Sequence, residues 1–138
     1  MNKFVWTIKN SVKNSTIDEQ HQMFFRIANS LLDLTERDDV TREEMMIKVS
    51  ELGNYAFYHL GTEEVMFDTY DYPEKIAHIK SHNAFREAVN KMMLEAREGN
   101  NTKELAEKMA NFAGDWLMNH IAVSDQHYAD FFVSKGLK

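Results

Sequence analysis

Two residues on one face of a long helical stretch carry the first sign of chemistry. His59 and Glu63 are four residues apart, so on a helix both side chains point to the same side. The same face otherwise carries apolar residues at helical spacing, as a face packed into a core does: Met45, Val49, Leu52, Ala56, Met66 and Phe67. A charged group buried on such a face must be paired or bound to a metal ion. We therefore expect partners for this pair elsewhere in the chain.

Three further segments carry histidines on apolar helical faces. His21 lies on the stripe that continues with Phe24, and His78 and His82 form an i, i+4 pair. Taken alone, each could be a hydrogen-bonded core histidine. His120 ends a fourth stripe and Asp125 follows five residues later, a spacing that turns an ideal helix by about 140° beyond one full turn. These two side chains could reach neighbouring metal ions, or the last turn could be widened or unwound.

Two other residues near these stripes are expected at the surface. His127 lies off every stripe, and Glu64 projects away from Glu63 on an ideal helix. We interpret both as solvent-facing side chains.

Composition restricts the class of protein. The chain has 138 residues, enough for one domain with a single core, and it lacks cysteine, so it has neither disulfides nor thiolate metal sites. It contains no run of apolar residues long enough to span a membrane and no signal peptide, which favours the cytoplasm. The net charge of −6 argues against nucleic acid and against an anionic membrane surface as partners.

Capping signals and breakers divide the chain into four helices. We expect an all-α single domain over residues 1–138, with an irregular N-terminal arm at 1–15 and helices at about 16–37, 41–68, 73–98 and 102–133. The signals are capping boxes starting at Thr16 and Thr41, Pro73 in a first turn and Gly99 as a stop. Short links between such helices predict an antiparallel up-down-up-down four-helix bundle. In this topology the starts of the first and third helices and the ends of the second and fourth lie at one end of the bundle. These are the parts of the helices that carry the histidines and carboxylates.

The converging donors suit two metal ions better than one. They comprise five imidazoles and two carboxylates, from His21, His59, Glu63, His78, His82, His120 and Asp125. Nitrogen and oxygen donors without thiolate favour iron, manganese or a zinc pair. Neutral histidines bring less negative charge than carboxylates do, so a histidine-rich site stabilises high-valent iron less well. This favours reversible O₂ binding over oxygenation chemistry.

The same residues carry a family resemblance. The chain resembles the single-domain bacterial hemerythrins in several pieces that span nearly all of it: Phe4-Val5-Trp6, Ile17-Asp18-Glu19-Gln20-His21, His59-x-x-x-Glu63-Glu64, His78-x-x-x-His82 and Trp116-Leu117-Met118-Asn119-His120-Ile121-x-x-x-Asp125. The resemblance implies two non-haem iron ions with an oxo or hydroxo bridge. One iron would take His78, His82 and His120, and the other would take His21 and His59. Glu63 and Asp125 would bridge both, which leaves the second iron with an open position for O₂.

The resemblance also implies a wall for the O₂ pocket. Trp116, Leu117 and Ile121 match the family's pocket residues, whereas Leu60 stands where the family usually has Phe. A smaller side chain at that position predicts a looser pocket and faster autoxidation.

Several functions could use such a site. The leading hypothesis is a binding protein, not an enzyme, that carries, stores or delivers O₂. The alternatives are a di-iron enzyme of the peroxidase or NO-handling type, an O₂ or redox sensor, and a structural di-metal bundle. The sequence indicates O₂ as the small-molecule partner and points to no particular protein partner.

Overall fold

The computed structural model describes residues 3–137, so residues 1, 2 and 138 of the predicted domain lie outside the described part. The described chain contains helices and no strands. The elements are a 3-10 turn η1 (Ile8–Asn10), α1 (Ser15–Thr35), α2 (Arg42–Thr69), α3 (Lys75–Glu98), α4 (Thr102–His120), the π-helix η2 (Ile121–Asp125) and α5 (Gln126–Ser134). Within residues 3–137, none of the helices is long and apolar enough to cross a membrane.

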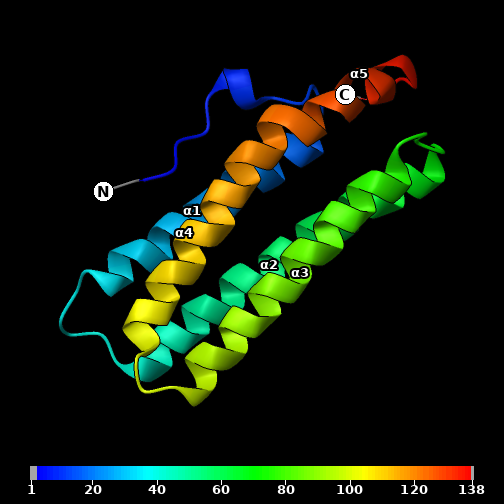
Figure 1. The fold of residues 1–138 in the computed structure, drawn as a ribbon. Coiled ribbons are helices and arrows are strands. Elements are labelled where there is room, and N and C mark those ends of the chain that lie inside the picture. The colour runs from blue at the N-terminus through cyan, green and yellow to red at the C-terminus, as the bar shows by residue number, and fades with distance from the viewer. Residues whose placement is uncertain (1–2, 138) are drawn as a thin grey trace.

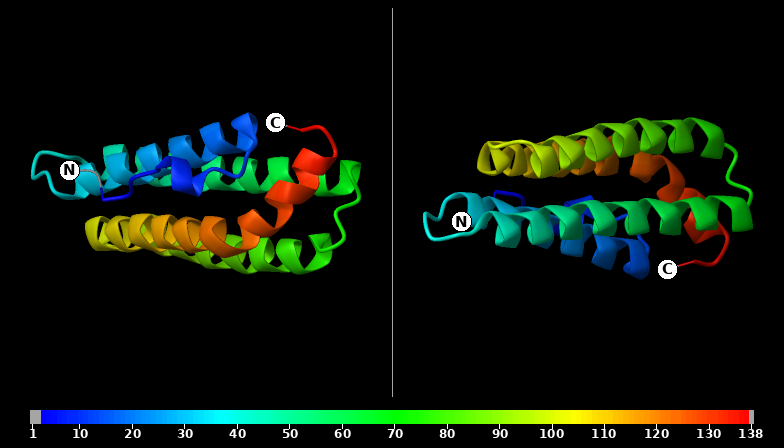
Figure 2. Two further views of the ribbon diagram at one scale, coloured as in Figure 1. Left: turned by 90° about the horizontal axis from the view of Figure 1, so that it is seen from above. Right: turned by 90° about the horizontal axis from the view of Figure 1, so that it is seen from below.

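The four long helices lie side by side and alternate in direction, which confirms the predicted up-down-up-down bundle (Figures 1 and 2). Helix α5 bends away from the axis of α4 and crosses the end of the bundle at which α1 begins and α2 ends (Figure 2). That end is therefore covered by the chain's own C-terminal segment.

The helix boundaries differ from the sequence prediction by one or two residues at several ends, and Pro73 lies ahead of α3 instead of in its first turn. Helix α1 begins at Ser15, because the side chain of Asn14, and not that of Thr16, accepts a hydrogen bond from the Ile17 amide at 3.1 Å. The expected helix over 102–133 is observed as α4, the π-helix η2 and α5 in direct succession, so the turn that ends at Asp125 is widened. By contrast, Thr41 caps α2 by accepting a hydrogen bond from the Glu44 amide at 3.1 Å, as its capping signal indicates.

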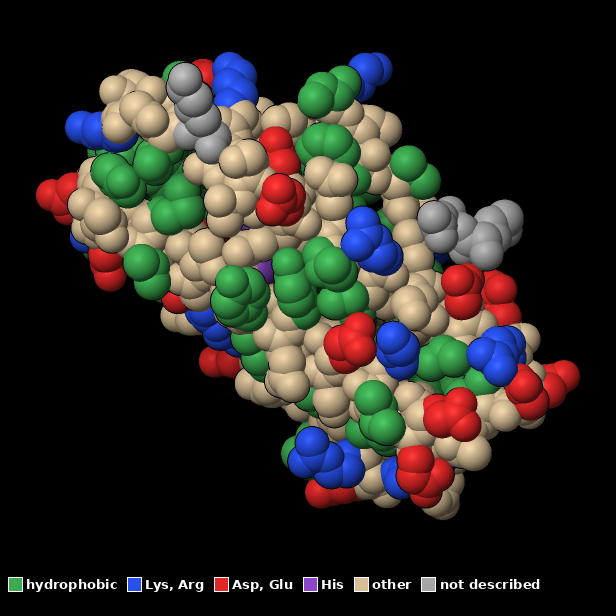
Figure 3. All heavy atoms as spheres, turned by 180° about the vertical axis from the view of Figure 1, so that it is seen from behind, with side chains coloured by type: hydrophobic (Ala, Val, Ile, Leu, Met, Phe, Trp, Pro, Cys, Tyr) green, Lys and Arg blue, Asp and Glu red, His purple; other side chains and the backbone are tan. Residues whose placement is uncertain are grey.

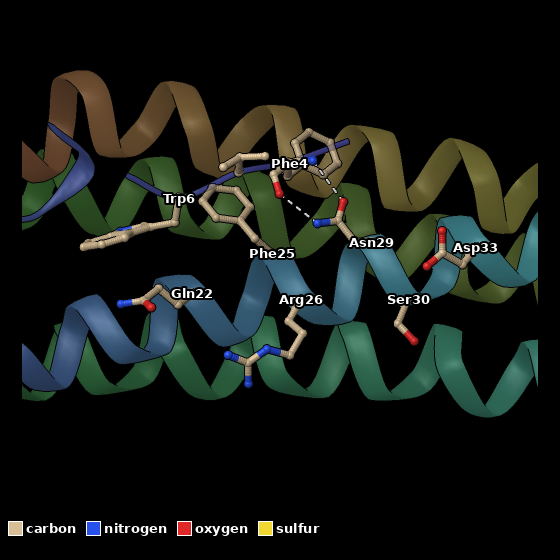
Figure 4. A pocket seen from close by; sticks show the side chains of 9 residues that line it. Phe4, Trp6, Gln22, Phe25, Arg26, Asn29, Ser30 and Asp33 are labelled. Atoms are coloured by element: carbon tan, nitrogen blue, oxygen red, sulfur yellow. Dashed lines mark hydrogen bonds between the residues drawn. The ribbon is translucent and has the colours of Figure 1, made fainter. Parts of the chain in front are cut away.

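The N-terminal arm lies along the bundle, and Asn29 on α1 fixes its first part. Asn29 on α1 accepts a hydrogen bond from the Phe4 amide at 2.9 Å and donates one to the Phe4 carbonyl at 2.7 Å (Figure 4). The Phe4 ring packs onto α4 at Gly114, where an added Cβ atom would lie 2.2 Å from the ring. The arm is thus held against α1 by Asn29 and against α4 by the fit of the Phe4 ring to Gly114.

A polar cavity of about 360 Å³ opens between the arm and α1 (Figure 4). Trp6, Gln22, Arg26 and Asp33 are among the residues that line it. These residues do not include any of the predicted metal ligands.

Candidate metal centre

The seven predicted donors lie together at the end of the bundle that α5 crosses. His21 comes from the start of α1, His59 and Glu63 from the later part of α2, His78 and His82 from the start of α3, and His120 and Asp125 from the end of α4 and η2. All seven are buried, with 7% as the largest exposed fraction, that of His78. Figure 3 accordingly shows almost no histidine on the face that it presents.

The donors form two groups that share one carboxylate. The first group comprises Glu63, His78, His82 and His120, and the second comprises His21, His59, Glu63 and Asp125. Within each group the ligand-type atoms all lie within 4.8 Å of one another. The Nε2 atoms of His78 and His120 are 2.8 Å apart, and those of His21 and His59 are 3.1 Å apart. Two nitrogens that each lie about 2.1 Å from one ion at a right angle would be about 3 Å apart, so both pairs fit a shared cation.

Asp125 joins the two groups through its two oxygens. Its Oδ1 atom lies 3.2 Å from Nε2 of both His78 and His120, and its Oδ2 atom lies 3.2 Å from Nε2 of His21. Glu63 presents a single oxygen, Oε1, at 3.1 Å from His82 Nε2 and 3.7 Å from His59 Nε2. The carboxylates therefore stand between the histidine groups, as bridging ligands do.

The π-helix brings Asp125 into this position. A π-helix closes its hydrogen bonds over five residues, which places residues i and i+5 on one face where an α-helix would separate them. Residues 121–125 take this form, and Asp125 Oδ1 reaches His120 Nε2. Of the two arrangements that the spacing left open, the structure shows the widened turn.

Several buried polar atoms at the centre lack a hydrogen-bond partner. They are Glu63 Oε1, His82 Nε2 and both carboxylate oxygens of Asp125. An unsatisfied buried polar atom costs about 1–3 kcal/mol. A cation held between the groups would satisfy all four atoms, so the residues present fit a metal centre.

The protonation states of two histidines and one carboxylate also suit metal binding. Burial lowers the pKa of both His59 and His120 to about 4, which leaves their imidazoles neutral at pH 7. Burial alone would raise the pKa of Asp125, but the facing imidazoles of His21, His78 and His120 outweigh it and hold that pKa below its usual range. Neutral imidazoles and an ionised carboxylate are the forms that bind metal ions.

Three side chains beyond the predicted donors hold them in place. Gln20 Oε1 lies 2.8 Å from His59 Nδ1, and the Tyr128 hydroxyl donates a hydrogen bond to Glu63 Oε2. Burial raises the pKa of Tyr128 well above its usual range, so the phenol remains a donor. The third side chain, Glu64, accepts from His82 Nδ1 at 2.8 Å and from Arg86 at 2.7 Å.

The expectation that Glu64 is a free surface carboxylate was therefore wrong. Glu64 does point away from Glu63, but toward α3 instead of solvent, and its side chain is 23% exposed. Nothing in the α2 pattern alone reveals this direction. Gln20 directly precedes His21 and Tyr128 follows Asp125 by three, so proximity in sequence to a donor is the one signal that could have marked them. His127, by contrast, is exposed as predicted.

Three of the four predicted pocket residues are fully buried apolar side chains, and the fourth contacts a donor. Leu60, Leu117 and Ile121 are fully buried. Trp116 stacks on the His120 ring, with ring centroids 4.2 Å apart and an interplanar angle of 15°. The indole therefore lies over the first group, whereas Phe24 meets the His59 ring of the second group edge-on at 6.4 Å.

A small cavity of about 140 Å³ borders on one of the donors, His78. It is lined by His78 together with residues of α3, its preceding loop and the C-terminal segment: Tyr72, Glu74, Ala77, Ser81, Ser124 and His127. The first group is thus the one that this cavity approaches.

Comparison with known proteins agrees with this geometry. The model of the hemerythrin HHE cation binding domain matches residues 12–132. A bacteriohemerythrin of Clostridium acetobutylicum is 26% identical and covers 92% of this chain and 99% of its own length. A bacteriohemerythrin of Stenotrophomonas maltophilia is also 26% identical and covers 91% of this chain and 79% of its own length.

The fold is also that of a solved protein. The crystal structure of a wild-type hemerythrin superposes with a TM-score of 0.82 at 24% identity and covers 93% of this chain and 96% of the solved one. The family model extends over most of the chain, and the buried histidines and carboxylates lie within the matched residues. The chain therefore belongs to the hemerythrin family.

Proposed function

We propose that this chain binds O₂ reversibly at a pair of non-haem iron ions and serves as an oxygen-binding protein, not as an enzyme. His78, His82 and His120 would hold one iron, and His21 and His59 would hold the other. Glu63 and Asp125 would bridge both ions, together with an oxo or hydroxo group. Such an iron pair would supply electrons to O₂ on binding and would recover them on its release.

The unequal division of the histidines is the observation that carries this proposal. Glu63 belongs to both groups and Asp125 Oδ1 also faces the first, but the first group contains three imidazoles and the second two. A structural di-metal site closes the coordination of both ions, whereas a site with one less protein donor keeps a position for an exchangeable ligand. The second group, His21 with His59, is therefore where O₂ would bind.

The surrounding side chains favour release of O₂ over its further reduction. Leu60, Leu117 and Ile121 are fully buried, and the Phe24 ring lies beside His59. Such a pocket excludes water and offers few protons to a bound oxygen ligand. Tyr128 is the buried hydroxyl nearest to Glu63, and its hydrogen bond commits its proton to that carboxylate.

Iron content tests the ligand assignment directly. The natural protein should bind two irons per chain, and His120→Ala should lose at least one of them. The matched control is His127→Ala, because His127 is exposed and belongs to neither group. Retention of both irons in the His120 variant would contradict the assignment. The cytoplasmic location and the carrier, storage or delivery role remain predictions.

A further inference from the structure

Histidines of the two groups differ in the contacts of Nδ1, the ring nitrogen that points away from the other donors. His82 Nδ1 in the first group lies 2.8 Å from a carboxylate oxygen of Glu64. His59 Nδ1 in the second group lies 2.8 Å from the amide oxygen of Gln20. The Nδ1 atom of His21, also in the second group, is buried without a hydrogen-bond partner. The first group thus has an anionic outer contact, whereas the second has a neutral contact and an unpartnered nitrogen.

Glu64 is itself held in position. Arg86 lies one helical turn after His82 on α3 and donates to the same Glu64 oxygen at 2.7 Å. The guanidinium also donates to Asn83 at 3.0 Å. These contacts fix the carboxylate between α2 and α3, so it meets His82 in one geometry.

The hydrogen bond determines which nitrogen of His82 faces the centre. With Nδ1–H donating to Glu64, the lone pair is on Nε2, which lies 3.1 Å from Glu63 Oε1 and has no hydrogen-bond partner of its own. A carboxylate at the outer nitrogen also makes the imidazole a stronger donor than an amide oxygen does, because the negative charge polarises the N–H bond.

We propose that Glu64, fixed by Arg86, is a positioning residue that makes the first group the tighter of the two metal positions. Metal ions then leave the second group first. The inference rests on the proposed function, in which the two groups hold iron. The first group also has one more histidine than the second, which by itself makes it bind a metal ion more tightly. The test must therefore separate the effect of Glu64 from that of the number of donors.

Release of iron to a ferrous chelator provides the test. The reduced natural protein, kept under argon, should lose iron in two phases, the fast one from the second group and the slow one from the first. His78→Ala and His21→Ala, each of which removes a donor from one group, assign the phases.

Substitutions at the two outer contacts should then act on different phases. Glu64→Gln keeps the size of the side chain and an oxygen that can accept from His82, but removes the charge. It should speed the slow phase roughly tenfold and leave the fast phase unchanged. Gln20→Glu places a carboxylate opposite His59 and should slow the fast phase alone. Glu51→Gln is the matched control on α2, because Glu51 is exposed, pairs with Lys48 at 3.5 Å and belongs to neither group; it should change neither phase.

The outcomes separate this inference from the proposed function. Two irons per chain with unchanged phases in Glu64→Gln would overturn the role of Glu64 and leave the proposed function intact. Equal acceleration of both phases would show a general loosening of the bundle and would also overturn it. A natural protein that never binds two irons would overturn the proposed function and this inference together.

Discussion

Removal of the Tyr128 hydroxyl should destabilise the metal-free protein through Glu63. Tyr128 is fully buried, and its hydroxyl is the donor to Glu63 Oε2. The other oxygen of this carboxylate already lacks a partner. In Tyr128→Phe the ring still packs against Phe67 and Phe132, at centroid distances of 5.5 and 5.1 Å, so no large cavity forms. The loss is therefore the cost of an unsatisfied buried carboxylate oxygen, about 2 kcal/mol.

The expected change is large enough to measure by thermal or urea unfolding. For 138 residues, 1 kcal/mol corresponds to a shift in Tm of about 3–4 °C, so the variant should melt about 7 °C lower than the natural protein. With iron bound, cations share the charge of Glu63, and the shift should be smaller. Tyr58→Phe is the control, since Tyr58 is 62% exposed and should change stability by less than about 0.5 kcal/mol. Equal shifts for the two variants would refute the assigned role of the Tyr128 hydrogen bond.

Three further predictions concern acid, metal removal and the pocket. The pKa values of His59 and His120 are about 4 in the folded protein, below the ordinary 6.5, so these histidines take up protons on unfolding below pH 6.5. The free energy of unfolding of the metal-free protein should therefore fall by up to about 3 kcal/mol per histidine as the pH falls from 6.5 to 4. Urea unfolding at several pH values measures this, and a flat profile over that range would count against neutral buried imidazoles. Removal of iron should lower Tm, because binding couples to folding; an unchanged melting curve would place the metal outside the core. Leu60→Phe should autoxidise more slowly than the natural protein, since a larger side chain at this buried position excludes water better. Decay of the oxygenated absorption band measures that rate, and equal decay would show that another ring, such as Phe24, already seals the pocket.

The sequence predicted those features that depend on one helix at a time. Apolar stripes and caps such as Thr41 place the helices, and antiparallel order brings their ends together. The burial of His59 and Glu63 follows from their place on an apolar stripe. That stripe spacing is local, so no knowledge of neighbouring helices was needed to place these donors on an inner face.

Contacts between elements could not be predicted in the same way. The direction of Glu64 toward α3 depends on how α2 is rotated and shifted against that helix, which periodicity does not specify. The π-helix before Gln126 changes the phase of every later residue, and this change brings Tyr128 inward to Glu63. The position of the N-terminal arm could not be predicted either, because the fit of Phe4 to Gly114 joins two positions far apart in the sequence.

Cycling the reduced, iron-loaded protein between O₂ and argon tests the central claim most directly. The account predicts an absorption band that appears with O₂, disappears under argon and returns over repeated cycles, with two irons and one O₂ per chain. Irreversible oxidation in the first cycle, or turnover of peroxide in place of a reversible band, would contradict it.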